Sequence, residues 1–327
     1  MRISYYFRHK APGNYSIENV FDPLISEIAS HETVSVFHTR KATDLMSIFR
    51  VSQIEADIHH ITGAENYLAM GLRPDRTILT VHDIGHFTET LNGFRKYVYR
   101  KLYWDLPPVD KLLVTTVSAF TKEQLIRNFS LREERVHVIP NPLRPLFEFD
   151  KKAMSARPVI LQVGGGKNKN VESLIEAVDG LDVKLLLVRR PEAWLTDLLT
   201  RRKIDHEFRY DLTDEEMVRA YKDCDMLFFA STYEGFGLPI IEAQAVGRPV
   251  ITSNVTSMPE VLKEEGSAIL VNPFDIKAIR EAIIRLAGDK AFHAHTVSKG
   301  LHNITFYSVR HIAMQYLNLY NELYGER

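Results

Sequence analysis

The chain has 327 residues, of which 45% are hydrophobic and 25% charged, and its formal net charge at pH 7 is −1. These values are ordinary for a globular protein of two domains, and a nearly neutral chain has no general electrostatic attraction for nucleic acid. The lone cysteine, Cys224, excludes an internal disulfide, which favours a reducing compartment such as the cytoplasm.

Short apolar segments in the first half of the chain predict strands, with helical patterns between most of them. The first segment is too short and too soon interrupted for a secretion signal, and no later apolar run is long enough to span a bilayer. The predicted strands are Ile3–Phe7, Thr33–Phe37, Ile58–Ile61, Thr77–Val81, Lys111–Thr116 and Arg135–Ile139.

His82 directly follows one of these strands, in the sequence Leu-Thr-Val-His-Asp-Ile-Gly-His. Parallel α/β sheets bind ligands at the carboxyl ends of their strands, so His82 is a candidate site residue. Two other interpretations stay open: a histidine of the core, and a metal site with Asp83 and His86. The second is disfavoured because no further ligand is visible nearby in the sequence.

Residues 94–104 form a basic, aromatic and helical stretch without an acidic residue. Such a face suits a peripheral contact with anionic lipid headgroups at the inner side of a membrane. The simpler interpretation, which we prefer, is a helix that packs its aromatic side chains inward and keeps its cations in water.

Three prolines in the segment 140–145 end the first set of strands, because proline continues neither a helix nor a central strand. We therefore predict domains at residues 1–146 and 147–307, with a polar, linker-like segment between residues 147 and 157. An amphipathic helix is expected at 308–327. The predicted strands of the second domain are Val159–Val163, Val183–Val188, Asp225–Ala230, Val250–Ser253 and Ala268–Val271.

A glycine-rich turn, Gly164-Gly165-Gly166-Lys167-Asn168-Lys169-Asn170, follows the first strand of the second domain and precedes a helix. Glycine N–H groups can approach phosphate oxygens closely, and lysine ammonium groups neutralise them. The turn lacks the Gly-Lys-Ser/Thr of a Walker loop and the dinucleotide fingerprint G-x-G-x-x-G, which disfavours a dehydrogenase.

Two glutamates, Glu234 and Glu242, bracket a second turn that runs from an apolar strand into a helix ending near Gly247. The intervening sequence is Gly235-Phe236-Gly237-Leu238-Pro-Ile-Ile. A helix N-terminus binds anions, and carboxylates accept hydrogen bonds from sugar hydroxyls. A nucleotide sugar combines both kinds of group.

This second motif resembles the signature of the retaining glycosyltransferases of family four. The resemblance covers nearly the whole chain and implies an α/β fold of the GT-B type, with two facing Rossmann-like domains that each hold a doubly wound parallel sheet. It further implies that Glu234 contacts the donor sugar and that Glu242 binds the ribose. The C-terminal helix is expected to return to the first domain.

The resemblance assigns further residues one by one. Lys169 is expected at the diphosphate, and the family's arginine is replaced by Gly165, so that Lys167 is the candidate substitute. His82 is expected near the reacting sugar carbon, and Tyr210 stands where the family places a glycine near the base. Residues bordering the acceptor are Gly13, Asn14, Tyr15, Ser16 and Ser118, and the last of these is foremost a helix N-cap.

The resemblance implies transfer of a sugar, with retention, from a UDP- or GDP-sugar to a hydroxyl of a saccharide or lipid-linked saccharide. The setting would be bacterial-type surface polysaccharide or glycolipid assembly, with no metal or other cofactor required. Two alternatives stay open: an epimerase of nucleotide sugars on the same fold, and a partner protein that binds nucleotide sugars without catalysis.

Overall fold

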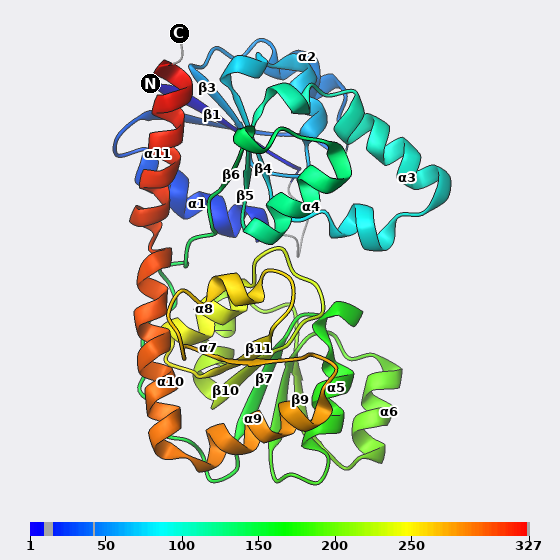
Figure 1. Cartoon of the computed structure of the whole chain (residues 1–327), viewed down its shortest axis with the longest axis vertical. Helices are drawn as coiled ribbons and strands as arrows, with labels where there is room; N and C mark the ends of the chain where they lie inside the picture. Colours follow the sequence, from blue (N-terminus) through cyan, green and yellow to red (C-terminus); the bar gives the residue numbers. More distant parts are fainter. Residues whose placement is uncertain (10–15, 42, 326–327) are drawn as a thin grey trace. The chain divides into compact units, whose positions relative to one another are not determined.

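The computed structural model describes residues 1–9, 16–41 and 43–325. The chain divides into two compact units (Figure 1). Unit 1 contains Met1–Arg144 and Ser308–Arg327, and unit 2 contains Pro145–Tyr307.

The described strands of unit 1 form one parallel sheet of six strands in the order β2-β1-β3-β4-β5-β6. The order reverses direction between β1 and β3, which makes their carboxyl ends the switch point where doubly wound sheets bind ligands. The strands are β1 (Arg2–Phe7), β2 (Thr33–His38), β3 (Ile58–Ile61), β4 (Thr77–Val81), β5 (Leu113–Thr116) and β6 (Val136–Val138).

The α-helices of unit 1 are α1 (Ser16–Ile28), α2 (Met46–Val51), α3 (Gly93–Arg100), α4 (Ala119–Phe129) and α11 (Val309–Gly325). Helix α11 lies beside α1 and brings two buried tyrosines to the sheet. The Tyr320 hydroxyl lies 2.6 Å from His60 Nδ1, and His60 Nε2 lies 2.7 Å from the Thr80 hydroxyl. This buried polar chain fixes α11 against β3 and β4, because each member would lose its partner if the helix moved.

The described strands of unit 2 form a second parallel sheet of six strands, in the order β12-β11-β10-β7-β8-β9. With β7 as the first strand this is the 3-2-1-4-5-6 order of the Rossmann fold, and its switch point lies between β7 and β10. The strands are β7 (Val159–Val163), β8 (Lys184–Val188), β9 (Asp205–Arg209), β10 (Met226–Phe229), β11 (Val250–Ser253) and β12 (Ile269–Val271).

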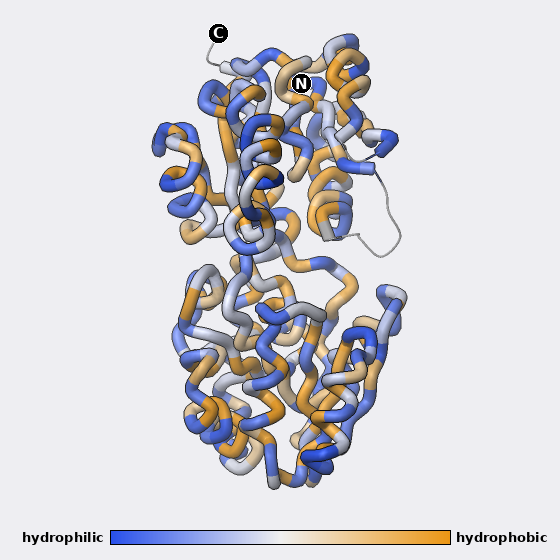
Figure 2. Tube along the Cα trace, turned by 90° about the vertical axis from the view of Figure 1, so that its right-hand side faces the viewer, coloured by the Kyte–Doolittle hydropathy of each residue, from blue (hydrophilic) through white to orange (hydrophobic). Residues whose placement is uncertain are grey.

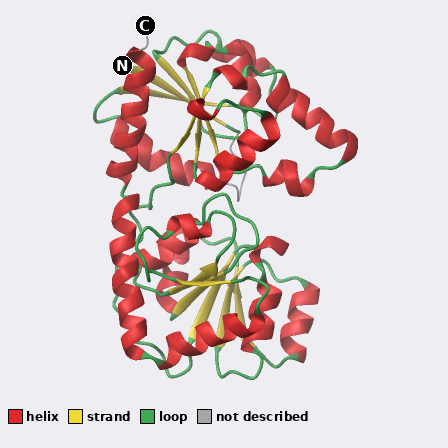
Figure 3. Ribbon diagram, in the orientation of Figure 1, coloured by secondary structure: helices red, strands yellow, loops and turns green. Residues whose placement is uncertain are grey.

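The α-helices of unit 2 cover both faces of its sheet (Figure 3). Helix α5 packs against α9, and α8 packs against α10. In Figure 2 the colours along the helices change from turn to turn, as expected for helices with one face on a sheet. The helices are α5 (Val171–Val178), α6 (Ala193–Arg201), α7 (Asp214–Asp223), α8 (Leu238–Ala245), α9 (Ile276–Gly288) and α10 (Lys290–Asn303).

Strand β9 is absent from the sequence prediction, which recognised the other strands with ends displaced by two residues at most. Its sequence Asp-His-Glu-Phe-Arg contains one strongly apolar residue, because an edge strand buries only part of each side chain. Its pairing with β8 is stabilised across the strands by an ion pair of Lys184 with Glu207 at 2.7 Å.

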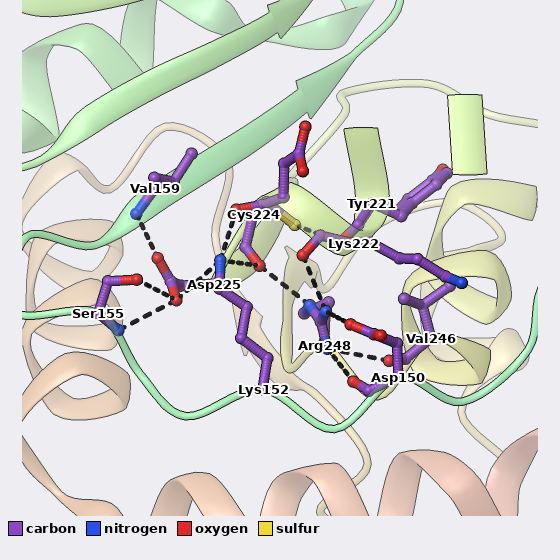
Figure 4. A network of polar contacts seen from close by, with 11 residues as sticks. Asp150, Lys152, Ser155, Val159, Tyr221, Lys222, Cys224, Asp225, Val246 and Arg248 are labelled. Atoms are coloured by element: carbon purple, nitrogen blue, oxygen red, sulfur yellow. Dashed lines mark hydrogen bonds and ion pairs between the residues drawn. The ribbon is translucent and has the colours of Figure 1, made fainter. Parts of the chain in front are cut away.

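The segment at residues 147–157 is anchored to unit 2, although its polar sequence predicted a linker (Figure 4). The buried carboxylate of Asp225 accepts hydrogen bonds from the N–H and the hydroxyl of Ser155, at 3.1 and 2.9 Å. The buried guanidinium of Arg248 donates to the Asp150 carboxylate at 2.7 Å. It also donates to the backbone carbonyls of Asp150, Lys222, Cys224 and Val246.

The stretch at residues 94–104 is helical in two parts, α3 and a following π-helical turn over Lys101–Asp105. Trp104 is buried and stacks on Phe129, whereas Phe94 and Tyr97 are exposed by 78% and 58%. The aromatic residues therefore point both inward and outward. Within the described residues no helix is both long and apolar enough to cross a membrane.

Candidate active site

Two loops meet at the switch point of unit 2, one after β7 and one after β10. The Thr232 N–H donates to the carbonyl of Asn168 at 2.8 Å, and the Asn168 side-chain amide donates to the Tyr233 carbonyl at 3.0 Å. The Asn170 amide donates to the Ala230 carbonyl at 3.1 Å. Two asparagines of the first loop thus hold the backbone of the second in place.

The loop after β7 needs glycine at two of its three glycine positions. Gly164 and Gly166 have φ angles of +97° and +99°, which side chains rarely allow. A Cβ on Gly164 would lie 2.8 Å from Cε of Lys169, so the lysine stem crosses directly over this glycine. A Cβ on Gly165 would meet no described atom within 4 Å, so the backbone leaves room for the first atom of a side chain at this position.

Lys169 and Glu234 form an ion pair between the two loops. The Lys169 ammonium lies 2.5 Å from Oε1 of Glu234 and 4.9 Å from the ring centre of Phe229, at the end of β10. Both side chains are mostly buried, with exposed fractions of 19% and 16%. The residue expected at the diphosphate and the residue expected at the donor sugar are therefore direct partners in this structure.

A serine after β11 supports the far side of the second loop. The Ser257 hydroxyl lies 2.9 Å from the Glu234 carbonyl and 3.0 Å from the Phe236 carbonyl. The Ser253 hydroxyl donates to the Ser231 carbonyl at 2.6 Å. Because neighbouring loops on both sides bind this backbone, Glu234 is held in position before a ligand arrives.

Helix α8 begins directly after this loop, as predicted. Gly237 is the N-cap residue of the helix and has a φ of +117°. Because glycine has no side chain, it does not cap the first turn of α8. Glu242 is buried on the same helix and accepts a hydrogen bond from the Tyr221 hydroxyl at 2.7 Å. The helix ends at Ala245, and Gly247 with a φ of +79° ends the following turn, as expected from the sequence.

Tyr210 lies apart from these groups. It follows the edge strand β9, which β7 and β8 separate from β10 in the sheet. Its ring is half exposed and lies 5.4 Å from the guanidinium of Arg190. Its predicted role near a nucleobase stays a prediction.

His82 lies at the carboxyl end of β4 in unit 1. Its Nε2 lies 2.9 Å from the carbonyl of Thr62, and because a carbonyl only accepts, Nε2 carries the proton. Burial lowers the pKa of His82, so the imidazole is neutral at pH 7 and Nδ1 is an acceptor. A Cβ on Gly63 would lie 3.0 Å from the ring, which shows how closely the β3 end approaches it.

The neighbours of His82 have other partners. Asp83 accepts a hydrogen bond from the Gly85 N–H at 2.8 Å, and His86 packs edge-on against Tyr99. In the part of the chain that the structure describes, no three His, Cys, Asp or Glu side chains are arranged to hold a metal ion.

Of the residues predicted to border the acceptor, Gly13, Asn14 and Tyr15 lie outside the described residues, and Ser16 begins α1. Ser118 is the N-cap of α4, where its hydroxyl accepts a hydrogen bond from the Thr121 N–H at 3.1 Å. The capping role expected of Ser118 is confirmed.

The sequence did not reveal the positions that support the site. Asn168 and Asn170 are visible as polar residues in a glycine-rich turn, but only the fold shows that they bind the loop after β10. Tyr221 reaches Glu242 from another helix. The strand order of a Rossmann fold would have suggested that the loop after β7 contacts the loop after β10, because these two strands are neighbours at the switch point.

Two family descriptions match the chain. "Glycosyl transferases group 1" matches residues 145–301, and "Glycosyltransferase Family 4" matches residues 25–145. The O-antigen chain mannosyltransferase B of Escherichia coli is 28% identical over 276 residues, which cover 77% of this chain and 71% of that protein.

Solved structures share the fold at low sequence identity. A glycosyltransferase from Rickettsia africae has a TM-score of 0.80 at 17% identity, covering 100% of this chain and 99% of its own. The Anabaena protein HepE, solved with UDP and glucose, has a TM-score of 0.76 at 18% identity, covering 98% of this chain and 100% of its own. The two-sheet architecture is therefore the GT-B fold.

Proposed function

Because the chain belongs to the group 1 glycosyltransferases, we propose that it transfers a hexosyl group from a UDP- or GDP-sugar to a saccharide or lipid-linked saccharide hydroxyl. The observation that carries the proposal is the Lys169–Glu234 pair at the β7/β10 switch point, beside the N-terminus of α8. The assembly of a surface polysaccharide or glycolipid is the proposed setting, in line with the name of the Escherichia coli relative.

The donor diphosphate would lie against the glycine loop and the N-terminus of α8. Lys169 and the positive end of the α8 dipole would stabilise the charge that grows on the leaving phosphate. Lys167 is exposed beside the same loop and is proposed as a second cation, in place of the family's arginine.

The two glutamates would divide the recognition of the donor. Glu242, buried on α8 with its carboxylate on the Tyr221 hydroxyl, would accept hydrogen bonds from the ribose. Glu234 would accept from the hydroxyls of the transferred sugar and would exchange part of its contact with Lys169 for them. Both assignments use carboxylates as acceptors, which give the stronger, charge-assisted hydrogen bonds.

The proposed reaction retains the configuration at the anomeric carbon. The bond from that carbon to the diphosphate oxygen breaks, and the acceptor oxygen attacks the same face. The departing phosphate takes the acceptor's proton, so no protein nucleophile is required. His82, neutral and with Nε2 bound to Thr62, would interact with the sugar or the diphosphate without acting as a general base.

The test is a turnover assay with UDP- and GDP-hexoses, with and without saccharide acceptors, in which nucleoside diphosphate release and the product's anomeric configuration are followed by NMR. We expect release that depends on an acceptor and a product with the donor's configuration. Release without an acceptor, or a free epimerised sugar, would instead identify a nucleotide-sugar epimerase or hydrolase. Binding without any turnover would identify a non-catalytic partner.

A peripheral membrane contact through residues 94–104, at the cytoplasmic face, is a separate proposal. The exposed rings of Phe94 and Tyr97 beside basic residues support it. Co-sedimentation with anionic vesicles should fall in a Phe94→Ser/Tyr97→Ser variant. Equal sedimentation of the variant and the unaltered protein would assign the stretch to packing alone.

A further inference from the structure

The two six-stranded sheets have four edge strands, and these edges differ in how they are protected. An edge strand carries unpaired backbone N–H and C=O groups with which a strand of another molecule can pair. Proteins usually prevent such pairing with very short edge strands, with charges or with proline. Strands β6 and β12 have three residues each and are soon followed by Pro140 and Pro273. Strand β9 carries Asp205, Glu207 and Arg209.

The fourth edge, β2, has none of these protections. It is six residues long, Thr-Val-Ser-Val-Phe-His, and contains no acidic residue, lysine, arginine or proline. Its register with β1 is continuous from Thr33 to His38, so no bulge turns the edge away. Its side chains are exposed or half-buried, and Val36 is 48% exposed. An edge of this kind is expected to pair with a further strand.

The backbone groups of every second residue of β2 point away from the sheet. The N–H of Thr33 donates to the carbonyl of Met1 at 3.1 Å, and the N–H of Thr39 donates to the last carbonyl of β1 at 3.0 Å. Odd-numbered residues of the strand therefore face β1, and the intervening residues face outward, because this direction alternates along a strand. The outward residues are Val34, Val36 and His38.

The strand is complementary to a second copy of itself in an antiparallel pair centred on Val36. In that register Val36 lies opposite Val36 of the partner subunit, and Val34 lies opposite the partner's His38. All three outward residues then form hydrogen-bonded pairs, which gives about six hydrogen bonds across the interface. The two Val36 side chains share one face of the joined sheet and pack as a cross-strand pair.

Charges at the two ends of β2 favour the antiparallel orientation. Glu32 directly precedes the strand, and the exposed Arg40 lies two residues beyond its end. In the register centred on Val36, each Glu32 lies opposite Arg40 of the partner subunit. One oxygen of the Glu32 carboxylate binds the ammonium of Met1, and the other can accept from that arginine. A copy in the parallel orientation would bring like charges together, which is unfavourable.

We propose that β2 is a self-association surface, through which two copies of this chain join the sheets of their first units into one continuous sheet. The occupant is a second copy because the outward residues and the flanking charges complement their own sequence. The interface is small, so the dimer is reversible and its Kd lies in the micromolar range. The loops at the β7/β10 switch point take no part, and the dimer is therefore independent of the proposed transfer reaction.

The mass of the protein in solution is the first test. Sedimentation equilibrium of the full chain at rising concentration should give a mass that increases from 37.6 kDa toward twice that value. Val36→Lys should raise the dimer Kd at least tenfold, because it places like charges opposite each other at the centre of the pair. The matched control is Val138→Lys on β6, the other edge of the same sheet, where Val138 is 40% exposed. This control should leave the Kd unchanged.

Cross-linking tests the register. The lone cysteine, Cys224, is buried, so a cysteine introduced on β2 supplies the accessible thiol. Val36→Cys should form a disulfide-linked dimer on mild oxidation, because opposite residues of a hydrogen-bonded pair have Cα atoms about 5.5 Å apart, within the reach of a disulfide. Thr33→Cys, at the exposed start of the strand, should not, because its two copies would lie about 20 Å apart in this register.

Four outcomes would overturn the proposal. They are a monomeric mass at every concentration, a dimer Kd that Val36→Lys leaves unchanged, an equal effect of Val138→Lys, and cross-linking of Thr33→Cys as efficient as that of Val36→Cys. If circular dichroism shows that Val36→Lys fails to fold, Val36→Pro replaces it, because the N–H that proline removes points away from β1. None of these measurements requires glycosyl transfer, so a failed transferase assay would leave them interpretable.

Discussion

Lys169 and Glu234 form an ion pair that joins two loops, so each residue has a structural role besides the one proposed in catalysis. The sequence predicted both as site residues but not their pairing, because the spacing of 65 positions along the chain says nothing about distance. The hydrogen bond of Glu242 with Tyr221, a residue that the sequence did not single out, was not predicted either. Motifs identify chemical groups, whereas the partners of those groups depend on which strands are neighbours.

A double-variant experiment separates the two roles of this pair. Lys169→Met should lower the free energy of unfolding by about 1–3 kcal/mol, because it leaves a mostly buried carboxylate without its cation. Adding Glu234→Gln should restore much of this stability but none of the activity. Denaturant titration gives the first quantity and donor turnover the second. Recovery of turnover in the double variant would show that the pair only holds the loops together.

At the scale of the elements, strands with a clear apolar run were predictable, and β9 was not, because its pattern is that of an edge strand. The glycine-to-helix transition before α8 was also predictable, since Gly237 and Gly247 mark its two ends. The attachment of α11 to unit 1 came only from the family resemblance. In the structure, buried tyrosines of α11 reach His60 and Thr80, and the spacing within α11 showed only an amphipathic helix.

The buried polar chain under α11 predicts a pH dependence of stability. Burial lowers the pKa of His60 to about 3 and that of its neighbour His59 to about 4. The unfolded chain, with histidine pKa values near 6.5, therefore binds protons that the folded chain does not, between about pH 6.5 and pH 4. Stability is complete above this window and decreases as the pH falls through it.

Between pH 7 and pH 5 each of these histidines should lower the free energy of unfolding by about 2 kcal/mol. Denaturant titrations give the free energy of unfolding at both pH values. Its decrease from pH 7 to pH 5 should be smaller by about 2 kcal/mol in His60→Asn than in the unaltered protein. The matched variant His311→Asn, exposed on α11, should retain the full difference. An unchanged pH dependence in His60→Asn would mean that His60 is not the buried neutral group described here.

At the scale of the whole molecule, each unit places its candidate residues at the carboxyl ends of parallel strands, where the sequence predicted them. The sequence located candidate residues best in unit 2, where the two motifs follow the neighbouring strands β7 and β10. The acceptor side gave the weakest prediction, because three of its candidate residues lie outside the described residues. A sequence without ligands also gives no basis for choosing between UDP and GDP.

The proposed stabilisation of the leaving diphosphate by Lys169 and the α8 N-terminus predicts activity without a divalent ion. Turnover of the preferred donor should persist in EDTA, measured as nucleoside diphosphate release after exhaustive dialysis against the chelator. The matched control is the same protein with added magnesium. Complete loss in EDTA with recovery on adding a divalent ion would show that the protein groups alone do not neutralise the leaving group.

The central claim is that unit 2 binds the donor nucleotide at the β7/β10 switch point, with Glu242 on the ribose. Isothermal titration of UDP and GDP into the unaltered protein, Glu242→Gln and the exposed control Glu281→Gln tests it most directly. One nucleotide should bind, with a Kd at least tenfold higher in Glu242→Gln, since a lost charge-assisted hydrogen bond costs about 1.5–3 kcal/mol. The control should bind normally. Equal affinity in Glu242→Gln, or binding of neither nucleotide by the unaltered protein, would contradict the claim.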